Sequence, residues 1–411
     1  MKTFTRSETL IAGAGLLASA AIQPLPALAA QPIVLGWVGP LSPPGSYAAG
    51  QEMKWAAELA IAELNAAGGV LGRPLKVLYE DTKGTPDQGT AAMELLATQR
   101  VAAVFGEFHS SVALAETQVA HKHGIPFLAT DVWADKLTAQ GYPEFFRVCP
   151  SNSLIYTMVG KWAAAAGFKN AAIMQEATDY GQGAVQVLSD IFKQHGIGTN
   201  VITVELSQQE FSPEILRLMN GSPRPDIFMV IVSGAAAYNI IRESCSSNFA
   251  PTPQTALYNG GGPALEKEVW ETDGKCAVNL ICEDVALPKA RWNTKAKRFA
   301  AAFQRHFKRQ PTGTAMESYD CVGVLAAAIA LAKSTEHKAV ISAMERLKYT
   351  GSRGTYAFST SHQPAWAYHQ FMSAPVMLIQ YSELNQSPEI SPILYPREWA
   401  TVPYLFAKPT A

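Results

Sequence analysis

The chain has 411 residues, of which 48% are hydrophobic and 16% are charged, and its formal net charge is -1. This composition predicts a globular protein that is long enough for two domains with sizeable cores. The near-zero net charge excludes the strongly basic surfaces by which proteins bind nucleic acid or anionic lipid.

The first 30 residues have the features of a cleavable signal peptide. Lys2 and Arg6 precede an apolar run over residues 10–22, which is too short to span a bilayer comfortably, and Ala27-Leu28-Ala29 matches a signal-peptidase site. Arg6 has no second arginine beside it, so general secretion is favoured over the twin-arginine route. We expect no later segment to be long and apolar enough to cross a membrane. We therefore expect a soluble protein that is exported to the periplasm.

The cysteines and histidines do not predict a metal or a cofactor. The five cysteines are Cys149, Cys245, Cys276, Cys282 and Cys321. An odd number at irregular spacing argues against a disulfide framework, and the absence of a CxxC pair argues against structural zinc. Cys276 and Cys282 flank a strand-like run that would hold them about 20 Å apart, too far for a bridge. One disulfide remains possible, but the sequence does not indicate which two cysteines form it.

Hydrophobic patterning predicts two sets of alternating strands and helices. The strands of the first set are expected at 32–41, 74–81, 101–108, 125–130 and 145–150. Those of the second set are expected at 170–178, 200–206, 226–233, 255–260 and 277–284, with helices at 152–167, 181–195, 213–220 and 235–246. Regular alternation of strand and helix predicts parallel sheets covered on both faces.

The later segments break this alternation. Helices near 293–308, 315–333 and 338–347 follow one another without strands, which suggests that the chain returns to cover the first lobe. A β-rich tail, with runs at 354–359 and 375–384, would then rejoin the second lobe. We therefore assign residues 31–150 with about 287–353 to lobe 1, and 151–286 with about 354–411 to lobe 2. The segment 362–371 either covers the cleft rim or caps a sheet.

Ligands of open parallel sheets bind outside the carboxyl ends of the strands. In two facing lobes these ends line a cleft. The corresponding segments are 42–47, 80–85, 107–111 and 129–133 in the first lobe, and 176–180, 233–236, 259–262 and 283–284 in the second.

The stretch GEFHSS (106–111) lies at one of these strand ends. Ser110 and Ser111 fall where a helix begins, so their hydroxyls and the free backbone N–H groups could bind a carboxylate, although a serine there can also be a simple helix cap. His109 could donate to a ligand or simply pack. A catalytic pair of His109 and Ser110 is disfavoured, because adjacent side chains on an extended strand end point to opposite sides and the chain has no G-x-S-x-G elbow. We predict that the protein is not an enzyme.

Aromatic residues and a glycine-rich turn lie at other strand ends. Trp37, Tyr47, Trp133 and Tyr180 could form the aromatic walls of a small-molecule pocket, with core packing as the alternative for each. The NGGGPAL segment, which contains Gly261, would let a ligand approach the backbone closely, or it is a plain turn.

Several stretches together resemble the leucine/isoleucine/valine-binding group, the solute-binding proteins of branched-chain amino-acid ABC importers. They are IVLGWVGPLSPPGSYAAGQEMKWAAELAIAELNAAGGVLGRPLKVLYEDTKGTPDQG, VFGEFHSS, GIPFLAT, FFRVCP, TDYGQG and ESYDCVGVLAAAI. The resemblance implies a type I periplasmic-binding-protein fold, in which two Rossmann-like lobes are joined by three crossovers. It also implies an exported receptor that traps a small solute between the lobes and hands it to a membrane permease.

The resemblance further implies a set of binding residues. Ser110 and Ser111 would grip a ligand carboxylate, the segment Asp131, Val132 and Trp133 would lie near the ligand ammonium, and Tyr180 would close the pocket from the second lobe. Tyr47, His109 and Gly261 complete the predicted ligand-binding set. We expect a monomer that binds neither nucleic acid, nor metal, nor cofactor.

Because of three departures from the family pattern, the chemical class of the solute is not determined by the resemblance. The NGGGPAL segment lacks the acidic residue that pairs with an amino-acid ammonium, Trp133 replaces a small hydroxyl residue, and His109 stands where the family can have cysteine. An amino acid then requires Asp131 to supply the charge, whereas an amide or an aromatic carboxylate does not. The alternatives to a receptor are a sensor module on the same fold and, less favoured, a secreted hydrolase.

Overall fold

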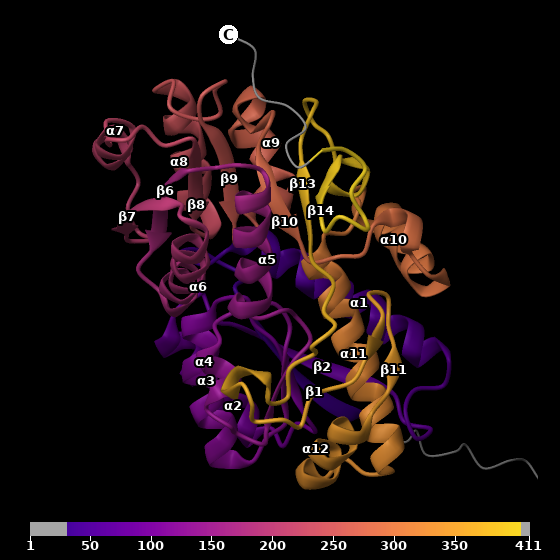
Figure 1. The fold of residues 1–411 in the computed structure, drawn as a ribbon. Coiled ribbons are helices and arrows are strands. Elements are labelled where there is room, and N and C mark those ends of the chain that lie inside the picture. Colours follow the sequence, from indigo (N-terminus) through magenta and orange to yellow (C-terminus); the bar gives the residue numbers. More distant parts are fainter. Residues whose placement is uncertain (1–30, 404–411) are drawn as a thin grey trace, which may run out of the picture.

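The computed structural model describes residues 31–403 and contains two α/β lobes, one above the other in Figure 1. The predicted signal peptide lies outside the described residues. Each lobe is built around a sheet with helices packed on it, and the ligand cleft expected from the strand directions lies between the lobes. The predicted fold of two Rossmann-like lobes is confirmed.

The sheet of the first lobe has five parallel strands in the order β2-β1-β3-β4-β5. Their bounds are β1 (Ile33–Gly39), β2 (Leu75–Asp81), β3 (Val104–Gly106), β4 (Phe127–Ala129) and β5 (Phe145–Arg147). The helices that follow these strands are α1 (Tyr47–Ala66), α2 (Pro86–Thr98), α3 (Ser110–His123) and α4 (Lys136–Ala139). The central strands are apolar throughout because helices cover both faces.

The sheet of the second lobe has seven strands in the order β14-β13-β10-β9-β8-β6-β7. The mutually parallel strands are β6 (Asn170–Glu176), β7 (Gly198–Val204), β8 (Ile227–Ile231), β9 (Ala256–Gly260) and β10 (Ile281–Asp284). β13 (Met377–Gln380) pairs antiparallel with β10, and β14 (Ile393–Tyr395) pairs antiparallel with β13. Its helices are α5 (Asn152–Ala165), α6 (Asp179–His195), α7 (Ser212–Met219), α8 (Gly234–Ser246) and α9 (Glu268–Thr272).

Three consecutive helices return to the first lobe, as their sequence pattern suggests. They are α10 (Thr294–Phe307), α11 (Gly313–Ala332) and α12 (His337–Arg346). Side chains from all three pack in the same hydrophobic core as β1 and α1. The length and apolar composition of α11 would allow it to cross a membrane, contrary to the prediction that no segment after the leader could. However, 78% of its most apolar stretch is buried inside the lobe, so α11 is a core helix.

The chain passes between the lobes at three places. At each place, one residue packs in the core of the first lobe and the next buried apolar residue packs in the core of the second, or the reverse. The three pairs are Val148 and Cys149, Val285 and Ala286, and Phe371 and Val376. The last crossing is later than the predicted boundary at about 353. The intervening segment stays on the first lobe because it carries aromatic side chains that the core there buries.

This returning segment begins with a short hairpin of β11 (Tyr349–Thr350) and β12 (Thr355–Tyr356). Phe358 and Phe371 are buried in the core of the first lobe, and Gln370 pairs with Arg147 at the free edge of β5. Residues 362–371 therefore cover a sheet edge of the first lobe, and of the two roles considered for this segment the sheet cap is the correct one.

A buried arginine connects two of the crossings. Arg353 donates to the carbonyl oxygens of Val285 at 2.6 Å and Val148 at 3.3 Å, and its guanidinium lies 2.8 Å from the Glu317 carboxylate. The side chains of Arg353 and Glu317 are both fully buried. This ion pair therefore holds the backbone at the point where the lobes meet.

One disulfide joins Cys245 at the end of α8 to Cys276, with the Cα atoms 5.7 Å apart. Residues 274–277 form a turn of 3₁₀ helix rather than the start of a strand, and β10 begins only at Ile281. The turn brings Cys276 back to α8, a contact that the predicted strand would not make. Cys149, Cys282 and Cys321 are buried free thiols.

Candidate functional site

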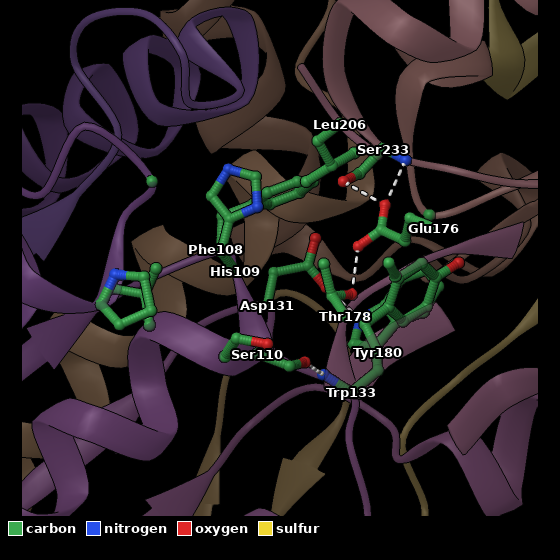
Figure 2. A pocket seen from close by; sticks show the side chains of 16 residues that line it. Phe108, His109, Ser110, Asp131, Trp133, Glu176, Thr178, Tyr180, Leu206 and Ser233 are labelled. Atoms are coloured by element: carbon green, nitrogen blue, oxygen red, sulfur yellow. Dashed lines mark hydrogen bonds between the residues drawn. The ribbon is translucent and has the colours of Figure 1, made fainter. Parts of the chain in front are cut away.

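A cavity of about 250 Å³ lies between the lobes at the carboxyl ends of the parallel strands. From the first lobe it is lined by Gly84, Pro86, Phe108, His109, Ser110, Ser111, Val112, Asp131 and Trp133. From the second lobe it is lined by Glu176, Ala177, Thr178, Tyr180, Leu206, Ser233 and Gly261. Seven of the nine predicted site residues therefore line one cavity. Figure 2 labels five of them around it, namely His109, Ser110, Asp131, Trp133 and Tyr180.

Ser110 is the first residue of α3 and offers a hydrogen-bond donor to the cavity. Its hydroxyl oxygen accepts the backbone N–H groups of Trp133 and Ala134, each at 3.1 Å. A hydroxyl has two lone pairs and one proton, so only the proton remains for a ligand. The first N–H groups of a helix also lack partners within the helix. This end of the cavity is therefore suited to a carboxylate or carbonyl oxygen.

Ser111 lines the cavity and also bonds to the second lobe. Its hydroxyl donates to Asp179 Oδ2 at 2.9 Å and accepts the Asp179 N–H at 3.1 Å, and Lys136 lies 2.8 Å from the other oxygen of the same carboxylate. Asp179 belongs to the second lobe, whereas Ser111 and Lys136 belong to the first. These contacts connect the lobes beside the cavity, and we call the three residues the interlobe latch.

His109 is arranged as a neutral hydrogen-bond acceptor. Its Nε2 accepts the backbone N–H of Ser46 at 3.0 Å, and burial lowers the pKa of the imidazole to about 4. The ring is therefore uncharged at neutral pH, with its proton on Nδ1. Because Nε2 is occupied and both lone pairs of Ser110 are used, His109 and Ser110 are not paired as base and nucleophile.

Two buried carboxyl groups, one from each lobe, also line the cavity. Asp131 accepts the Thr314 hydroxyl at 2.6 Å and the Trp133 indole N–H, and burial raises its pKa. Glu176, at the end of β6, accepts the backbone N–H and the hydroxyl of Ser233, each at 2.7 Å, and burial raises its pKa as well. Among the described residues that line the cavity, none is lysine or arginine.

Aromatic rings close the cavity from both lobes. Trp133 and Tyr180 meet edge to face with their ring centroids 5.6 Å apart, and the Tyr180 hydroxyl lies 2.5 Å from that of Tyr156. Phe108 is also buried and forms a further wall. Trp133 thus occupies space that a small hydroxyl residue would leave open, and the cavity is correspondingly narrow.

Gly261 lies in the glycine-rich turn that lacks the family's acidic residue. Its backbone has φ +90°, and a Cβ placed there would come within 2.8 Å of the Tyr180 hydroxyl, so a side chain has no room. Its N–H donates to Glu283 at 2.8 Å, which places a buried carboxyl group behind the turn. Burial raises the pKa of Glu283 to about 7.

Two predicted site residues do not line the cavity. Val132 is fully buried in the first lobe, and its carbonyl accepts from Arg147, because successive side chains along this extended segment point to opposite sides. Tyr47 is 50% exposed at the start of α1, where its hydroxyl donates to Gln51. Contact of either residue with a solute therefore stays a prediction.

Several lining residues could not be singled out from the sequence. Glu176 and Ser233 lie in segments that the strand-end rule selects, but their types gave no reason to prefer them. Phe108 and Leu206 are apolar residues that the sequence does not distinguish from ordinary core positions. Position in a predicted strand-end segment was the only signal for Glu176, Ser233 and Phe108, and Leu206 had no signal beyond ending a predicted strand.

Two lobes with an aromatic-walled cavity between their strand ends are typical of the class of solute-binding proteins. Residues 32–380 match the periplasmic binding protein family, and the chain belongs to that family. A curated relative, the Leu/Ile/Val-binding protein homolog 3 of Brucella melitensis, is 24% identical over 313 residues, which are 75% of this chain and 82% of the relative. Matches to other Brucella Leu/Ile/Val-binding protein homologs span about half of those proteins' length.

Solved structures share the fold. The branched-chain amino-acid binding protein LivJ of Streptococcus pneumoniae in complex with isoleucine has a TM-score of 0.76 and 20% identity, covering 88% of this chain and 100% of that one. A solute-binding protein of an ABC transporter from R. palustris in complex with benzoate has a TM-score of 0.74 and 21% identity, covering 88% and 95%. The chain therefore shares the two-lobed fold of these solute-binding proteins.

Proposed function

We propose that this receptor is exported to the periplasm, binds a small amino-acid-like zwitterion between its lobes, and delivers it as a monomer to a membrane permease. The observation that carries the proposal is the polarity of the cavity. The cavity combines the Ser110 proton and the start of α3 with the carboxyl groups of Asp131 from the first lobe and Glu176 from the second. No lysine or arginine among the described lining residues balances those two acids.

A solute ammonium group is the best partner for the carboxyl groups of Asp131 and Glu176. Asp131 receives one hydrogen bond on each oxygen, which leaves further lone pairs for a ligand. Arg353 favours the ionised form of Asp131, but burial still raises its pKa, so a solute cation would stabilise the buried carboxylate further. Asp131 would then supply the charge that the glycine-rich turn lacks. The names of the Leu/Ile/Val-binding relatives also support an amino acid.

An aromatic carboxylate is a second candidate. Phe108, Trp133 and Tyr180 give the cavity flat aromatic walls, and the R. palustris protein of the same fold was solved with benzoate. The carboxylate of such a solute would bind the Ser110 hydroxyl and the start of α3, and Asp131 would stay protonated. A hydrolase is disfavoured because His109 Nε2 and both Ser110 lone pairs are occupied. A sensor inside the cell is disfavoured by the signal-peptide features of residues 1–30.

Isothermal titration of the mature protein with L-isoleucine, benzoate and acetamide tests these candidates. For an amino-acid receptor, Asp131→Asn should weaken isoleucine binding by about 10- to 100-fold, because a charge-assisted hydrogen bond is lost. Glu58→Gln, an exposed acid on α1 outside the cavity, is the matched control and should bind as the wild type does. Binding of benzoate alone, with little effect of Asp131→Asn, would favour the aromatic carboxylate and contradict the zwitterion.

The delivery step and the oligomeric state need separate measurements. Light scattering of the purified protein should give the mass of one chain. Uptake of the solute into vesicles that contain the cognate permease should require the receptor. A receptor variant that does not bind the solute should not support uptake, even when it is added in excess.

A further inference from the structure

A second interlobe space lies behind the solute cavity. This second chamber has a volume of about 180 Å³, and Trp270 and Arg309 are among the residues that line it. A gap of about 10 Å³ lies between the two spaces. Leu265 and Glu266 line both the gap and the second chamber, whereas Phe108 lines both the gap and the solute cavity. The three spaces therefore follow one another between the lobes.

Phe108 lines both the solute cavity and the gap, so its side chain stands between the two spaces. Its ring is 8% exposed and packs edge-on against His109, with the ring centroids 5.3 Å apart. The tip of the ring lies against the backbone of Gly262 in the second lobe, where a Cβ would stand 3.4 Å from Phe108 Cζ. Gly262 has φ +97°, a conformation that favours glycine. The ring thus reaches from one lobe to the other.

The gap is too small to admit part of a solute while the ring is present. A space of about 10 Å³ is close to the least that holds one water molecule. Removing the ring would add the volume of a phenyl group to the gap, because packed surroundings relax only partly around a deleted side chain. That added volume would join the solute cavity to the second chamber.

We infer that Phe108 is a specificity-determining residue that limits the length of the solute by closing the cavity at the end nearest the second chamber. A receptor with a small residue at this position would admit a solute with a longer tail. The inference rests on the proposed function only for the choice of amino acids as probes.

The experiment measures length preference in a series of straight-chain α-amino acids, from norvaline to 2-aminodecanoic acid. The wild type should bind norvaline at least 10-fold more tightly than 2-aminodecanoic acid. In Phe108→Ala, affinity should instead rise with length by up to about fourfold for each methylene group that becomes buried. Leu206→Ala is the matched comparison, because it enlarges the solute cavity from the second lobe without removing the partition, so it should retain the preference for short tails.

An unchanged preference for short tails in folded Phe108→Ala would overturn the inference. If neither protein binds any amino acid, the proposed zwitterion fails, and the same comparison is made with straight-chain carboxylates from butyrate to decanoate. A crystal structure of Phe108→Ala without solute gives an answer that does not depend on the solute class. One continuous cavity is expected, whereas collapse of Leu265 into the vacated space would overturn the inference.

Discussion

The hydroxyl of Ser111 on the first lobe donates a 2.9 Å hydrogen bond to the carboxylate of Asp179 on the second, beside the cavity. Lys136 lies 2.8 Å from the other carboxylate oxygen. These interlobe bonds require the lobes to be close together, as they are when a two-lobed receptor closes around its ligand. The interlobe latch therefore stabilises the closed form rather than the individual lobes.

Breaking the latch should weaken solute binding more than it weakens folding. In Asp179→Ala we expect an affinity about 3- to 30-fold lower, because the closed state loses hydrogen bonds to a charged group and the binding-competent fraction falls. Titration calorimetry measures the affinity, and small-angle scattering should show a larger radius of gyration. Asp190→Ala, on the same helix but outside the latch, serves as control. Equal affinity in the two variants would rule out the latch.

The ion pair of Arg353 and Glu317 should contribute strongly to stability. We expect Arg353→Met to lower the free energy of unfolding by about 3–5 kcal/mol, because it leaves the fully buried Glu317 carboxylate without its partner. Urea unfolding measures the change. The double variant with Glu317→Gln should recover part of the loss, since the unpaired charge is then removed. A double variant no more stable than Arg353→Met would contradict this account.

The Cys245–Cys276 disulfide should stabilise the second lobe without affecting binding. The two cysteines are 31 positions apart in the chain, and the chain-entropy model gives about 3–4 kcal/mol for a loop of that length. Replacing both with serine should lower the free energy of unfolding by a similar amount. Solute affinity should stay within about twofold of the wild type because neither cysteine lines the cavity. A large loss of affinity in a folded variant would show that the bridge also shapes the site.

Buried His109 should make the protein less stable in acid. Its pKa is about 4 when folded and about 6.5 in an unfolded chain, so between these values the unfolded state binds more protons. The free energy of unfolding should therefore fall as the pH drops from 6.5 to 4, by up to about 3 kcal/mol from this residue. His109→Gln, whose amide oxygen can still accept the Ser46 N–H, should lose that part of the pH dependence. Parallel stability curves for both proteins would contradict the assignment.

The order of strands and helices could be predicted from the sequence because it depends on local periodicity. Parallel strands covered on both faces are apolar runs, and helices carry an apolar stripe, so both leave a pattern in the chain. The strand-end rule also located most of the cavity, since Ser110, Asp131, Trp133 and Tyr180 all follow predicted strands. The position of the last crossing was wrong because the aromatic residues that hold 355–371 on the first lobe have no periodic pattern of their own.

What the sequence by itself determined is the class of fold, the edge of each sheet where a ligand binds, and the family resemblance. Only the tertiary structure decided which side chains face that edge and what each one is bonded to. In the structure, Val132 is buried in the first lobe, Ser111 is hydrogen-bonded to Asp179, and Cys245 is joined to Cys276 by a disulfide. Glu176 and Ser110 line the same cavity, and Phe108 lies against Gly262. These outcomes depend on contacts between residues far apart in the chain, whereas periodicity records only which residues are buried.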